Sequence, residues 1–250
     1  MIDAVDERPQ PILDVRALCM RFGGIAALDD VSFAVAGGAI TGLIGPNGAG
    51  KTTCFNCITR LYQPTSGEIT FKGEDLLRCA PHQVARRRVA RTFQNVELFG
   101  SMTVLENALV GFQTRFGSDA GERRAQREAL DVLDYLGLAQ DAEVPVRSLP
   151  FGTRKMVELA RALIVRPELL LLDEPAAGLG HAAVTELATT LRRIQRDYSA
   201  TIVMVEHQMR LVMNVCEHII VLASGRKLAE GDPASIRANK TVIDAYLGAA

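Results

Sequence analysis

One stretch constrains this chain more than any other: Gly45-Pro46-Asn47-Gly48-Ala49-Gly50-Lys51-Thr52-Thr53. It fits the pattern G-x-x-x-x-G-K-[ST] and follows a strand-like apolar run, Ile40 to Ile44. Glycines let consecutive backbone N–H groups turn inward around phosphate oxygens, and a helix beginning near Lys51 adds the positive end of its dipole. The stretch therefore predicts a strand, a phosphate-binding loop and a helix in succession, with a nucleoside triphosphate as ligand.

Two side chains in this loop have expected roles. Lys51 should reach the β- and γ-phosphates, and Thr52 should place its hydroxyl on Mg²⁺. The alternative is a Gly-rich surface turn, which the flanking strand and helix disfavour. The loop alone does not choose between a kinase, a GTPase and an ATPase.

A second motif narrows that choice. An apolar run, Leu169 to Leu172, leads directly into Asp173-Glu174, as in a buried strand that ends in two carboxylates. We expect Asp173 to hold Mg²⁺ in its outer shell and Glu174 to polarise the attacking water. A core strand with acidic residues at its solvent end is the alternative for such a motif taken alone. Two consecutive acids downstream of the loop favour hydrolysis over transfer to a second substrate.

Three further features carry a resemblance: Gln94 in Arg91-Thr92-Phe93-Gln94, the run Leu149-Pro150-Phe151-Gly152-Thr153, and His207 after an apolar strand. Taken singly, Gln94 would be a polar loop residue and His207 a core histidine, and Phe22, an aromatic residue earlier in the chain, would be ordinary packing at a strand end. Their order and spacing relative to Lys51 and Asp173-Glu174 make the chain resemble an ABC-type ATPase. The resemblance covers about Leu13 to Leu247.

The resemblance implies a fold and further site residues. The fold would be α/β, a P-loop NTPase (RecA-like) core with a mainly parallel sheet, an antiparallel β subdomain and an inserted helical lobe. Gln94 would sense Mg²⁺ and the membrane partner, His207 would contact the γ-phosphate, and Phe22 would stack on adenine. Gly152 would cap the nucleotide of the opposite subunit in trans.

Several phrases resemble one group in particular, the ATP-binding subunit of branched-chain amino-acid importers. They are Arg21-Phe22-Gly23-Gly24, Phe55-Asn56-Cys57, Arg91-Thr92-Phe93-Gln94, Met102-Thr103-Val104-Leu105-Glu106-Asn107, Ala176-Ala177-Gly178-Leu179 and Asp244-Ala245-Tyr246-Leu247-Gly248. The chain resembles the larger of the two ATPases in that group. The resemblance implies ATP and Mg²⁺, two integral-membrane permease subunits, a second ATPase in a heterodimer (a homodimer being the alternative) and, indirectly, an extracytoplasmic binding protein.

Departures from the family pattern lead to a hypothesis of asymmetric hydrolysis. Pro150 and Thr153 replace the serine and glutamine of the signature segment, which leaves fewer donors for phosphate. Gly180 stands where the family usually has Asp or Asn, and its flexibility would loosen coupling between the two sites. Gln208 replaces a common Asp.

Two other functions stay open at this point. One is another ABC system, for urea or short-amide import or for lipopolysaccharide export. The other is a soluble nucleotide-dependent regulator, against which Gln94 and a complete lobe behind it argue. The transported substrate and the direction of transport rest on the resemblance.

Composition limits location and partners. With 28 basic and 29 acidic residues the net charge is −1, so we expect no nucleic-acid partner. No apolar run approaches the roughly 20 residues of a membrane helix, and Met1 to Pro11 lacks the apolar core of a secretion signal. We expect a peripheral protein on the cytoplasmic face of the inner membrane.

Arginine and cysteine clusters have structural interpretations. We expect Arg86-Arg87-Arg88 and Arg123-Arg124 to lie on solvated helix faces, with a partner-facing patch as the alternative. The five cysteines show no regular framework, as in a reducing compartment. Cys54 and Cys57 form a C-x-x-C but follow Lys51 on its predicted helix, where we expect core packing.

The resemblance implies one ABC-type nucleotide-binding domain over 1–250, with a core at 12–94 and 155–250 and a helical lobe that includes the signature segment at 95–154, and the helical, polar pattern from about Asn95 to Leu149 agrees with such a lobe. In the lobe, Leu130, Leu133, Leu136 and Leu138 are spaced for an amphipathic helix. The other predicted elements are strands at Leu13–Leu18, Val31–Val35, Ile40–Ile44, Glu68–Lys72, Leu169–Leu172, Thr201–Val205 and Ile219–Leu222, helices at Lys51–Leu61, Ala182–Arg196 and Thr241–Tyr246, and a hairpin framed by Gly225 and Gly231.

Overall fold

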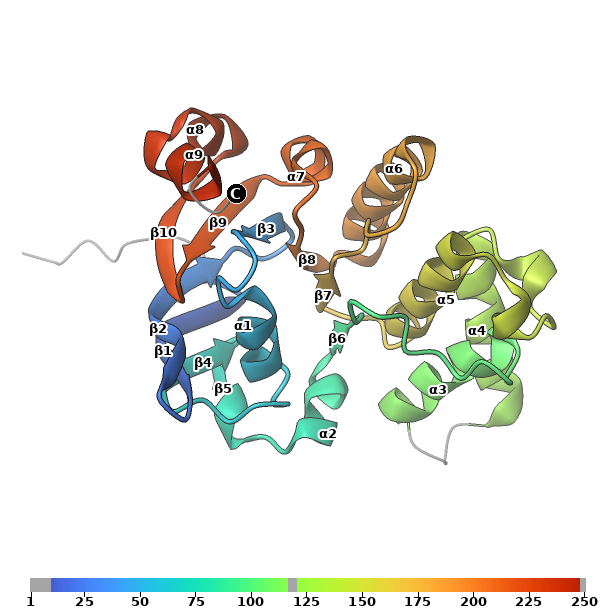
Figure 1. Cartoon of the computed structure of the whole chain (residues 1–250). Coiled ribbons are helices and arrows are strands. Elements are labelled where there is room, and N and C mark those ends of the chain that lie inside the picture. The colour runs from blue at the N-terminus through green and yellow to red at the C-terminus, as the bar shows by residue number, and fades with distance from the viewer. Residues whose placement is uncertain (1–9, 117–120, 248–250) are drawn as a thin grey trace, which may run out of the picture.

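A mainly parallel sheet runs through the middle of the molecule (Figure 1), with the strand order β10-β9-β3-β8-β7-β6. Five strands are parallel, and β10 joins antiparallel to β9. The central strands are continuous apolar runs because helices or a second sheet cover both faces. Their bounds are β3 Ile40–Ile44, β6 Val89–Arg91, β7 Leu169–Asp173, β8 Thr201–Val205, β9 His218–Ala223 and β10 Arg226–Gly231.

The computed structural model describes residues 10–116 and 121–247. Most of the N-terminal segment Met1 to Pro11, interpreted above as lacking a secretion signal, therefore lies outside the described residues, as does Gly248. In the part of the chain that is described, no helix is both long and apolar enough to cross a membrane.

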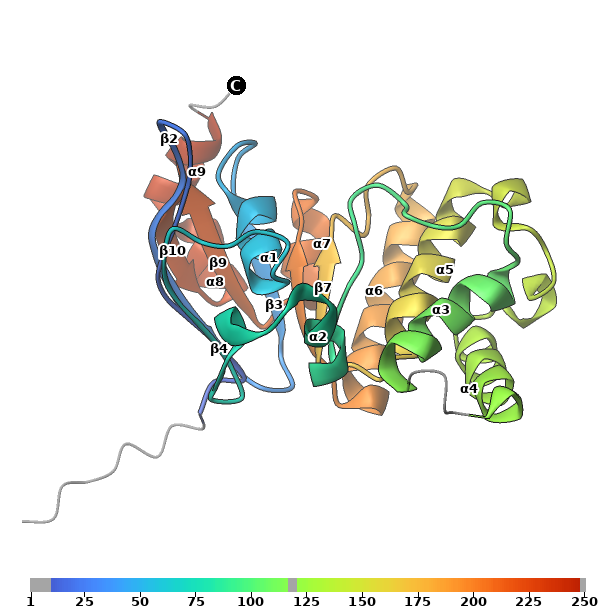
Figure 2. The same cartoon turned by 90° about the horizontal axis from the view of Figure 1, so that it is seen from below.

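An antiparallel sheet forms a second layer, with the order β2-β1-β4-β5. Helix α1 (Lys51–Ile58) lies between this sheet and the parallel one, and its Cys54, Phe55, Cys57 and Ile58 are fully buried there (Figure 2). The strands are β1 Leu13–Phe22, β2 Ile25–Val35, β4 Ser66–Phe71 and β5 Glu74–Asp75.

A group of helices projects from the other end of the molecule (Figures 1 and 2). It contains α3 (Val104–Phe116), α4 (Glu122–Tyr135) and α5 (Phe151–Leu163), of which α5 leads back into β7. The remaining helices are α2 Pro81–Val84, α6 His181–Tyr198, α7 Met209–Val215, α8 Pro233–Ala238 and α9 Lys240–Leu247.

The parallel sheet separates two hydrophobic cores. Alternate residues of its strands point to opposite faces. On one face Leu170, Ile202 and Met204 pack with helices α3 to α7. On the other, Leu171 and Val203 pack with α1 and the antiparallel sheet.

The predicted fold class is confirmed, and the predicted bounds of Ile40–Ile44 and Thr201–Val205 match β3 and β8. Helix α1, however, ends at Ile58 rather than Leu61, because Thr59 forms its C-cap and Arg60 takes a left-handed φ of 63°. The strand at Glu68–Lys72 begins earlier, at Ser66.

The predicted apolar face in the lobe is only partly correct. Leu130 is 42% exposed, and the residues of α4 that are buried are Ala129, Val132 and Leu133. The helix ends at Tyr135 in a Schellman-type cap, in which the N–H of Leu138 bonds to the carbonyl of Leu133 at 2.7 Å. Leu136 and Leu138 therefore follow the helix and do not extend its face.

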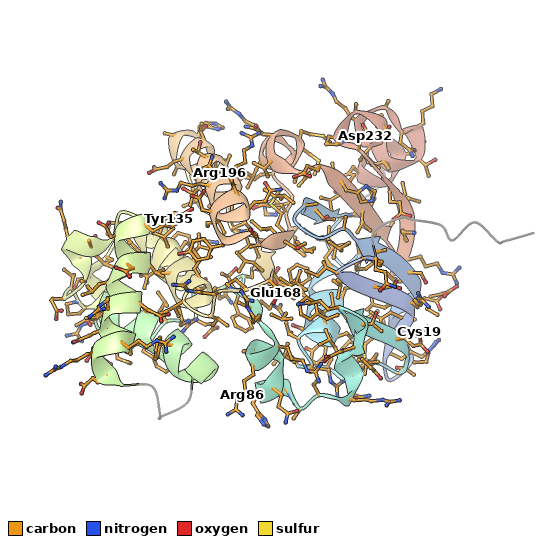
Figure 3. All side chains as sticks on the ribbon, turned by 180° about the vertical axis from the view of Figure 1, so that it is seen from behind. Cys19, Arg86, Tyr135, Glu168, Arg196 and Asp232 are labelled. Atoms are coloured by element: carbon orange, nitrogen blue, oxygen red, sulfur yellow. The ribbon has the colours of Figure 1, made fainter. Side chains whose placement is uncertain are left out.

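The arginines of the two predicted clusters differ in their exposure and in their ion pairs. Arg86 is exposed and points away from the body of the molecule (Figure 3), and Arg123 is exposed on α4. Arg87 instead forms an ion pair with Glu74, and Arg88 pairs with Glu168 at 2.8 Å. Both side chains are still exposed, at 36% for Arg87 and 43% for Arg88, so the two residues lie on the solvated surface and also have acidic partners that the sequence did not predict.

Candidate active site

The loop between β3 and α1 depends on two glycines for its shape. Gly45 has φ of 152°, and a Cβ there would lie 2.1 Å from the carbonyl oxygen of Leu222. Gly50 has φ of 99°, and a Cβ there would lie 2.6 Å from the carbonyl oxygen of Ala27. Only glycine fits such close backbone approaches. Neighbouring strands therefore fix the loop from two sides.

The turn after β9 gives the loop further support. The N–H of Gly225 donates to the carbonyl of Ala49 at 3.2 Å, and the carbonyl of Gly225 accepts from the N–H of Asp29 at 2.8 Å. Gly225 was predicted only as a hairpin residue. It also connects the phosphate-binding loop to β2.

Lys51 lies at the first position of α1 and is buried to 8% exposure. Its Nζ donates to the carbonyls of Gly45 at 2.8 Å and Pro46 at 2.9 Å. Burial lowers the pKa of the ammonium, while the negative charges of Glu174 and Asp173 raise it. The ammonium therefore lies within the electrostatic reach of both carboxylates and at the mouth of the loop.

Asp173, at the end of β7, has a geometry that fits Mg²⁺. Its Oδ2 accepts from Arg91 Nη2 at 2.7 Å, whereas its Oδ1 is buried with no hydrogen-bond partner among the described residues. Burial raises the pKa of this carboxyl, and the hydrogen bond and charge of Arg91 lower it. A free carboxylate oxygen suits Mg²⁺, which proteins hold with one or two carboxylates, waters and substrate phosphates.

Thr52 is exposed at the start of α1, next to Lys51, where its hydroxyl is available as a second oxygen ligand. Within the described ranges, no three His, Cys, Asp or Glu side chains form a set that could ligate a metal ion by themselves. The oxygen donors present are of the kind that Mg²⁺ prefers.

Glu174 brings together the predicted catalytic side chains. Gln94 Nε2 donates to Glu174 Oε2 at 3.0 Å, and His207 Nδ1 lies 3.7 Å from the same oxygen. These residues come from three separate places: the segment after β6, the end of β7 and the end of β8. The carboxyl ends of parallel strands meet at one edge of the sheet, as expected for a ligand site in an open α/β sheet.

Sequence reasoning missed two buried residues that hold this geometry. Lys155 on α5 donates to the carbonyl of Glu174 at 2.8 Å. Glu206 is fully buried, and its carboxylate accepts from the N–H groups of Ala176 at 2.8 Å and His207 at 2.9 Å. The sequence carries a signal for Glu206, because it ends an apolar strand in the same way as Asp173.

The remaining predicted residues lie at the end of β1, on the phosphate-binding loop and at the start of α5. Phe22 ends β1, is 44% exposed and contacts the ring of Tyr62 edge-on, with centroids 5.3 Å apart. Asn47 and Gly48 are exposed on the loop, and Pro46 and Thr53 are half-buried. Gly152 lies in the first turn of α5, and a Cβ there would lie 3.4 Å from Leu179 Cδ2.

Gly152 is thus adjacent to the segment that follows Glu174, and its predicted contact with nucleotide requires an opposing subunit. Pro150 occupies the N-cap of α5 and offers no side-chain oxygen to the helix start.

This arrangement has the parts needed for phosphoryl chemistry on water. A backbone cradle and an ammonium meet the phosphates, a carboxylate oxygen and a hydroxyl are available to a divalent cation, and a second carboxylate lies beside them. The sequence profile described as "ABC transporter" matches residues 28–177. The chain belongs to this family. Members of the family are ATPases, and so is this chain.

Similarity to individual proteins extends over almost the whole length of this ABC ATPase. It is 42% identical to the high-affinity branched-chain amino acid transport ATP-binding protein BraF of Pseudomonas aeruginosa, covering 96% of this chain and 99% of BraF. It is 44% identical to LivG of Escherichia coli strain K12, which carries the same description, over 96% of this chain and 99% of LivG. A second profile, "Branched-chain amino acid ATP-binding cassette transporter", matches residues 226–250.

Solved structures agree with the fold. The ABC ATPase superimposes on the ADP conformation of MJ1267, an ATP-binding cassette of an ABC transporter, with a TM-score of 0.87 and 29% identity. The match covers 96% of this chain and 100% of that one. A nucleotide-free ATP-binding cassette from an ABC transporter matches with a TM-score of 0.86 and 28% identity, over 95% of this chain and 99% of that chain.

Proposed function

We propose that this ABC ATPase powers the import of branched-chain amino acids from the cytoplasmic face of the membrane. The observation that carries the cargo assignment is the near-full-length identity of 42–44% to BraF and LivG, both described as branched-chain amino acid transport proteins. The matching C-terminal profile, which covers a segment outside the nucleotide motifs, supports the same group.

In the proposed mechanism, the loop from Gly45 to Thr53 surrounds the phosphates of ATP with its backbone N–H groups, which every residue except Pro46 supplies, and Lys51 contacts the β- and γ-phosphates. Phe22 offers an exposed ring to adenine. When bound, Mg²⁺ would supply positive charge that stabilises the negative charge developing on the phosphates. Thr52, Gln94 and Asp173 would hold this ion, and Asp173 has an oxygen, Oδ1, that no hydrogen bond occupies among the described residues.

Glu174 polarises the attacking water. Gln94 holds the Glu174 carboxylate through its amide, at 3.0 Å. His207 contacts the γ-phosphate, a role supported by its place beside the catalytic carboxylate, with Nδ1 3.7 Å from Glu174 Oε2. Catalysis in this scheme is positioning plus electrostatic stabilisation, as is usual for phosphoryl transfer.

We further propose that two ATPases close face to face and that Gly152 of one contacts the nucleotide of the other. Closure by ATP requires contacts that the open form lacks, and the signature segment supplies them. Because Pro150 and Thr153 provide fewer donors than serine and glutamine, one of the two composite sites hydrolyses more slowly. This asymmetry favours a heterodimer with a second, related ATPase.

A groove beside Gln94 supports the proposal of a membrane partner. It has a volume of about 540 Å³ and lies between the parallel sheet and the helical lobe. Exposed apolar side chains line it, among them Leu61 (53% exposed) and Phe99 (51% exposed). Phe93 and Glu97 also line it, so an occupant would touch the segment that carries Gln94.

The proposed occupants are two integral-membrane permease subunits, one on each ATPase, which an extracytoplasmic binding protein loads. The helical lobe, which with all of α5 extends beyond residue 154 to Leu163, would turn as a unit against the core and carry the motion from Gln94 to the groove. Large exposed apolar side chains in a groove are typical of an interaction site.

The test uses a tagged Glu174→Gln variant in the native cell. Trapped with ATP in membranes, it should retain a second ATPase, two permeases and an amino-acid binding protein, identified by mass spectrometry. Deletion of the gene should abolish uptake of radiolabelled leucine, and wild-type protein should restore it. Lipid-export proteins among the partners would instead assign the ATPase to lipid export. Recovery of soluble partners alone would contradict a transport function.

A paired groove variant separates hydrolysis from coupling. Phe99→Ala should keep ATP hydrolysis in the purified chain and lose leucine uptake in cells, because the change lies in the groove and not beside Glu174. Leu130→Ala is the matched control, since Leu130 is also an exposed apolar residue of the lobe but lies outside the groove. Unchanged uptake by Phe99→Ala would contradict the proposed docking surface.

A further inference from the structure

Arg91 has no role in the mechanism proposed above, yet its side chain contacts the site directly. It is the last residue of β6, and its side chain is only 5% exposed. Its Nη2 lies 2.7 Å from Oδ2 of Asp173, whose side chain is 1% exposed. The pair is therefore a buried, charge-assisted hydrogen bond at the end of the strand that carries Glu174.

The other arm of the guanidinium reaches the helix of the phosphate-binding loop. Nη1 donates to Asn56 Oδ1 at 2.7 Å and to Thr59 Oγ1 at 3.1 Å. Asn56 lies within α1, and Thr59 is its C-cap. One planar group thus bonds in fixed directions to α1 on one side and to Asp173 on the other.

Two aromatic rings keep this plane from turning. The guanidinium carbon lies 5.5 Å from the ring centroid of Phe55 and 5.0 Å from that of Phe93. Phe93 directly precedes Gln94. Arg91 consequently contacts α1, the end of β7 and the segment leading to Gln94 at the same time.

This geometry determines which oxygen Asp173 can offer. Oδ2 is committed to Arg91, while Oδ1 is buried and unpaired among the described residues. A carboxylate held at one oxygen cannot rotate to present both. Charge balance alone would not need this arrangement, because a lysine supplies the same charge without the fork.

We propose that Arg91 is a positioning residue for the Mg²⁺ site, which orients Asp173 so that Oδ1 alone faces the hydrated metal. The inference rests on the metal role of Asp173 in the proposed function. Groups that orient a metal ligand from behind usually change metal affinity by about 10- to 100-fold when they are removed. Nucleotide binding without metal should not depend on Arg91, because Arg91 bonds to Asp173, Asn56 and Thr59 and not to the loop.

The test compares Arg91→Lys with wild type in the full-length chain. Lysine keeps a positive charge beside Asp173, so no buried carboxylate is left unpaired, but it loses the simultaneous bonds to α1 and Asp173. The measured quantity is the dissociation constant of a non-hydrolysable fluorescent ATP analogue, in EDTA and in excess Mg²⁺. The dissociation constant in EDTA divided by the dissociation constant in Mg²⁺ reports how much the metal strengthens binding, and we call this quotient the ratio.

We expect this ratio to fall by about tenfold in Arg91→Lys, with binding in EDTA unchanged. Arg88→Lys is the matched control, because Arg88 belongs to the same segment and pairs with Glu168 at 2.8 Å, away from Asp173. Its ratio should equal that of wild type. An unchanged ratio in Arg91→Lys, or equal losses with and without Mg²⁺, would overturn the inference.

Two further variants keep the outcome decisive. Asp173→Asn should lower the ratio to about one, and a normal ratio in this variant would refute the metal role of Asp173. A low ratio in Asp173→Asn together with a normal ratio in Arg91→Lys would refute only the positioning role of Arg91. Should Arg91→Lys fail to fold, Asn56→Ala decides, because it removes one acceptor of Nη1 and leaves the ion pair. Its ratio should fall by about threefold, and no change would refute the proposal.

Discussion

The ammonium of Lys155 donates to the backbone carbonyl of Glu174 across 2.8 Å. Lys155 lies on α5, one turn after Phe151, and is buried to 8% exposure. Glu174 has a φ of 49°, a left-handed conformation that costs free energy in a residue other than glycine. Helix α5, which begins in the signature segment, therefore holds the backbone of Glu174, the proposed catalytic residue, in its strained conformation within one subunit.

Lys155→Met should lower ATP turnover by about tenfold to 100-fold and leave ATP affinity unchanged. Methionine fills the space but cannot hold the Glu174 carbonyl, and small displacements of a reacting group carry penalties of this size. Steady-state kinetics with binding measured separately check the split between turnover and affinity. Arg154→Met is the control on the neighbouring position. A variant with normal turnover would show that this bond has no catalytic effect.

Lys51→Ala should weaken ATP binding by about 10- to 100-fold. The size follows from losing a charge-assisted contact worth about 1.5–3 kcal/mol. Equilibrium dialysis with labelled ATP measures the loss. Lys72→Ala serves as the matched control, since Lys72 forms a partly exposed pair with Glu168. If Lys51→Ala binds ATP as well as wild type does, Lys51 has no role at the phosphates.

Gly50→Ala should destabilise the protein by about 1–3 kcal/mol and impair ATP binding. The new Cβ would meet the carbonyl oxygen of Ala27 at 2.6 Å, at a φ of 99° that alanine rarely adopts. Urea unfolding followed by circular dichroism gives the free energy. Gly24→Ala provides the comparison, because a Cβ there would meet nothing within 4 Å. Equal stability of the two variants would contradict the close approach at Gly50.

The cysteines should differ in reactivity. Burial raises the pKa of the Cys57 thiol to about 11 and that of Cys216 to about 12, and it also raises that of Cys54. At pH 8 an ordinary thiol then holds more than about a hundredfold more thiolate than Cys57. Half-buried Cys19 should react first with a disulfide reagent, and the buried cysteines only after unfolding in urea. Fast labelling of Cys57 in the folded protein would revive a redox role for the C-x-x-C.

The sequence predicts best those parts whose signal is local. The loop with its fixed glycine spacing and the strands at 40–44 and 201–205 are recognisable in the sequence, because burial on both faces makes these strands mostly apolar, with one threonine in each. β6 was missed because three residues, Val89 to Arg91, carry no periodicity. The short helices α7 and α8 escaped for the same reason.

In the site, residues of chemically obvious type were predicted and their supports were not. Gln94, Glu174 and His207 were expected together, and in the structure Gln94 and His207 both approach one carboxylate oxygen of Glu174. Arg91 and Lys155 look like surface residues in the sequence, since their burial depends on partners 82 and 19 positions away in the chain. Such long-range contacts leave no local pattern.

The parallel sheet acts as a septum between two compartments. On the side of α1 and the antiparallel sheet, packing determines the shape of the phosphate-binding loop, while on the other side it determines the shape of the helical lobe. Substitutions in separate compartments should have additive effects on stability, since distant sites without shared partners behave independently. A lineage can therefore change the packing of α3 and α4 without disturbing the packing that shapes the phosphate-binding loop.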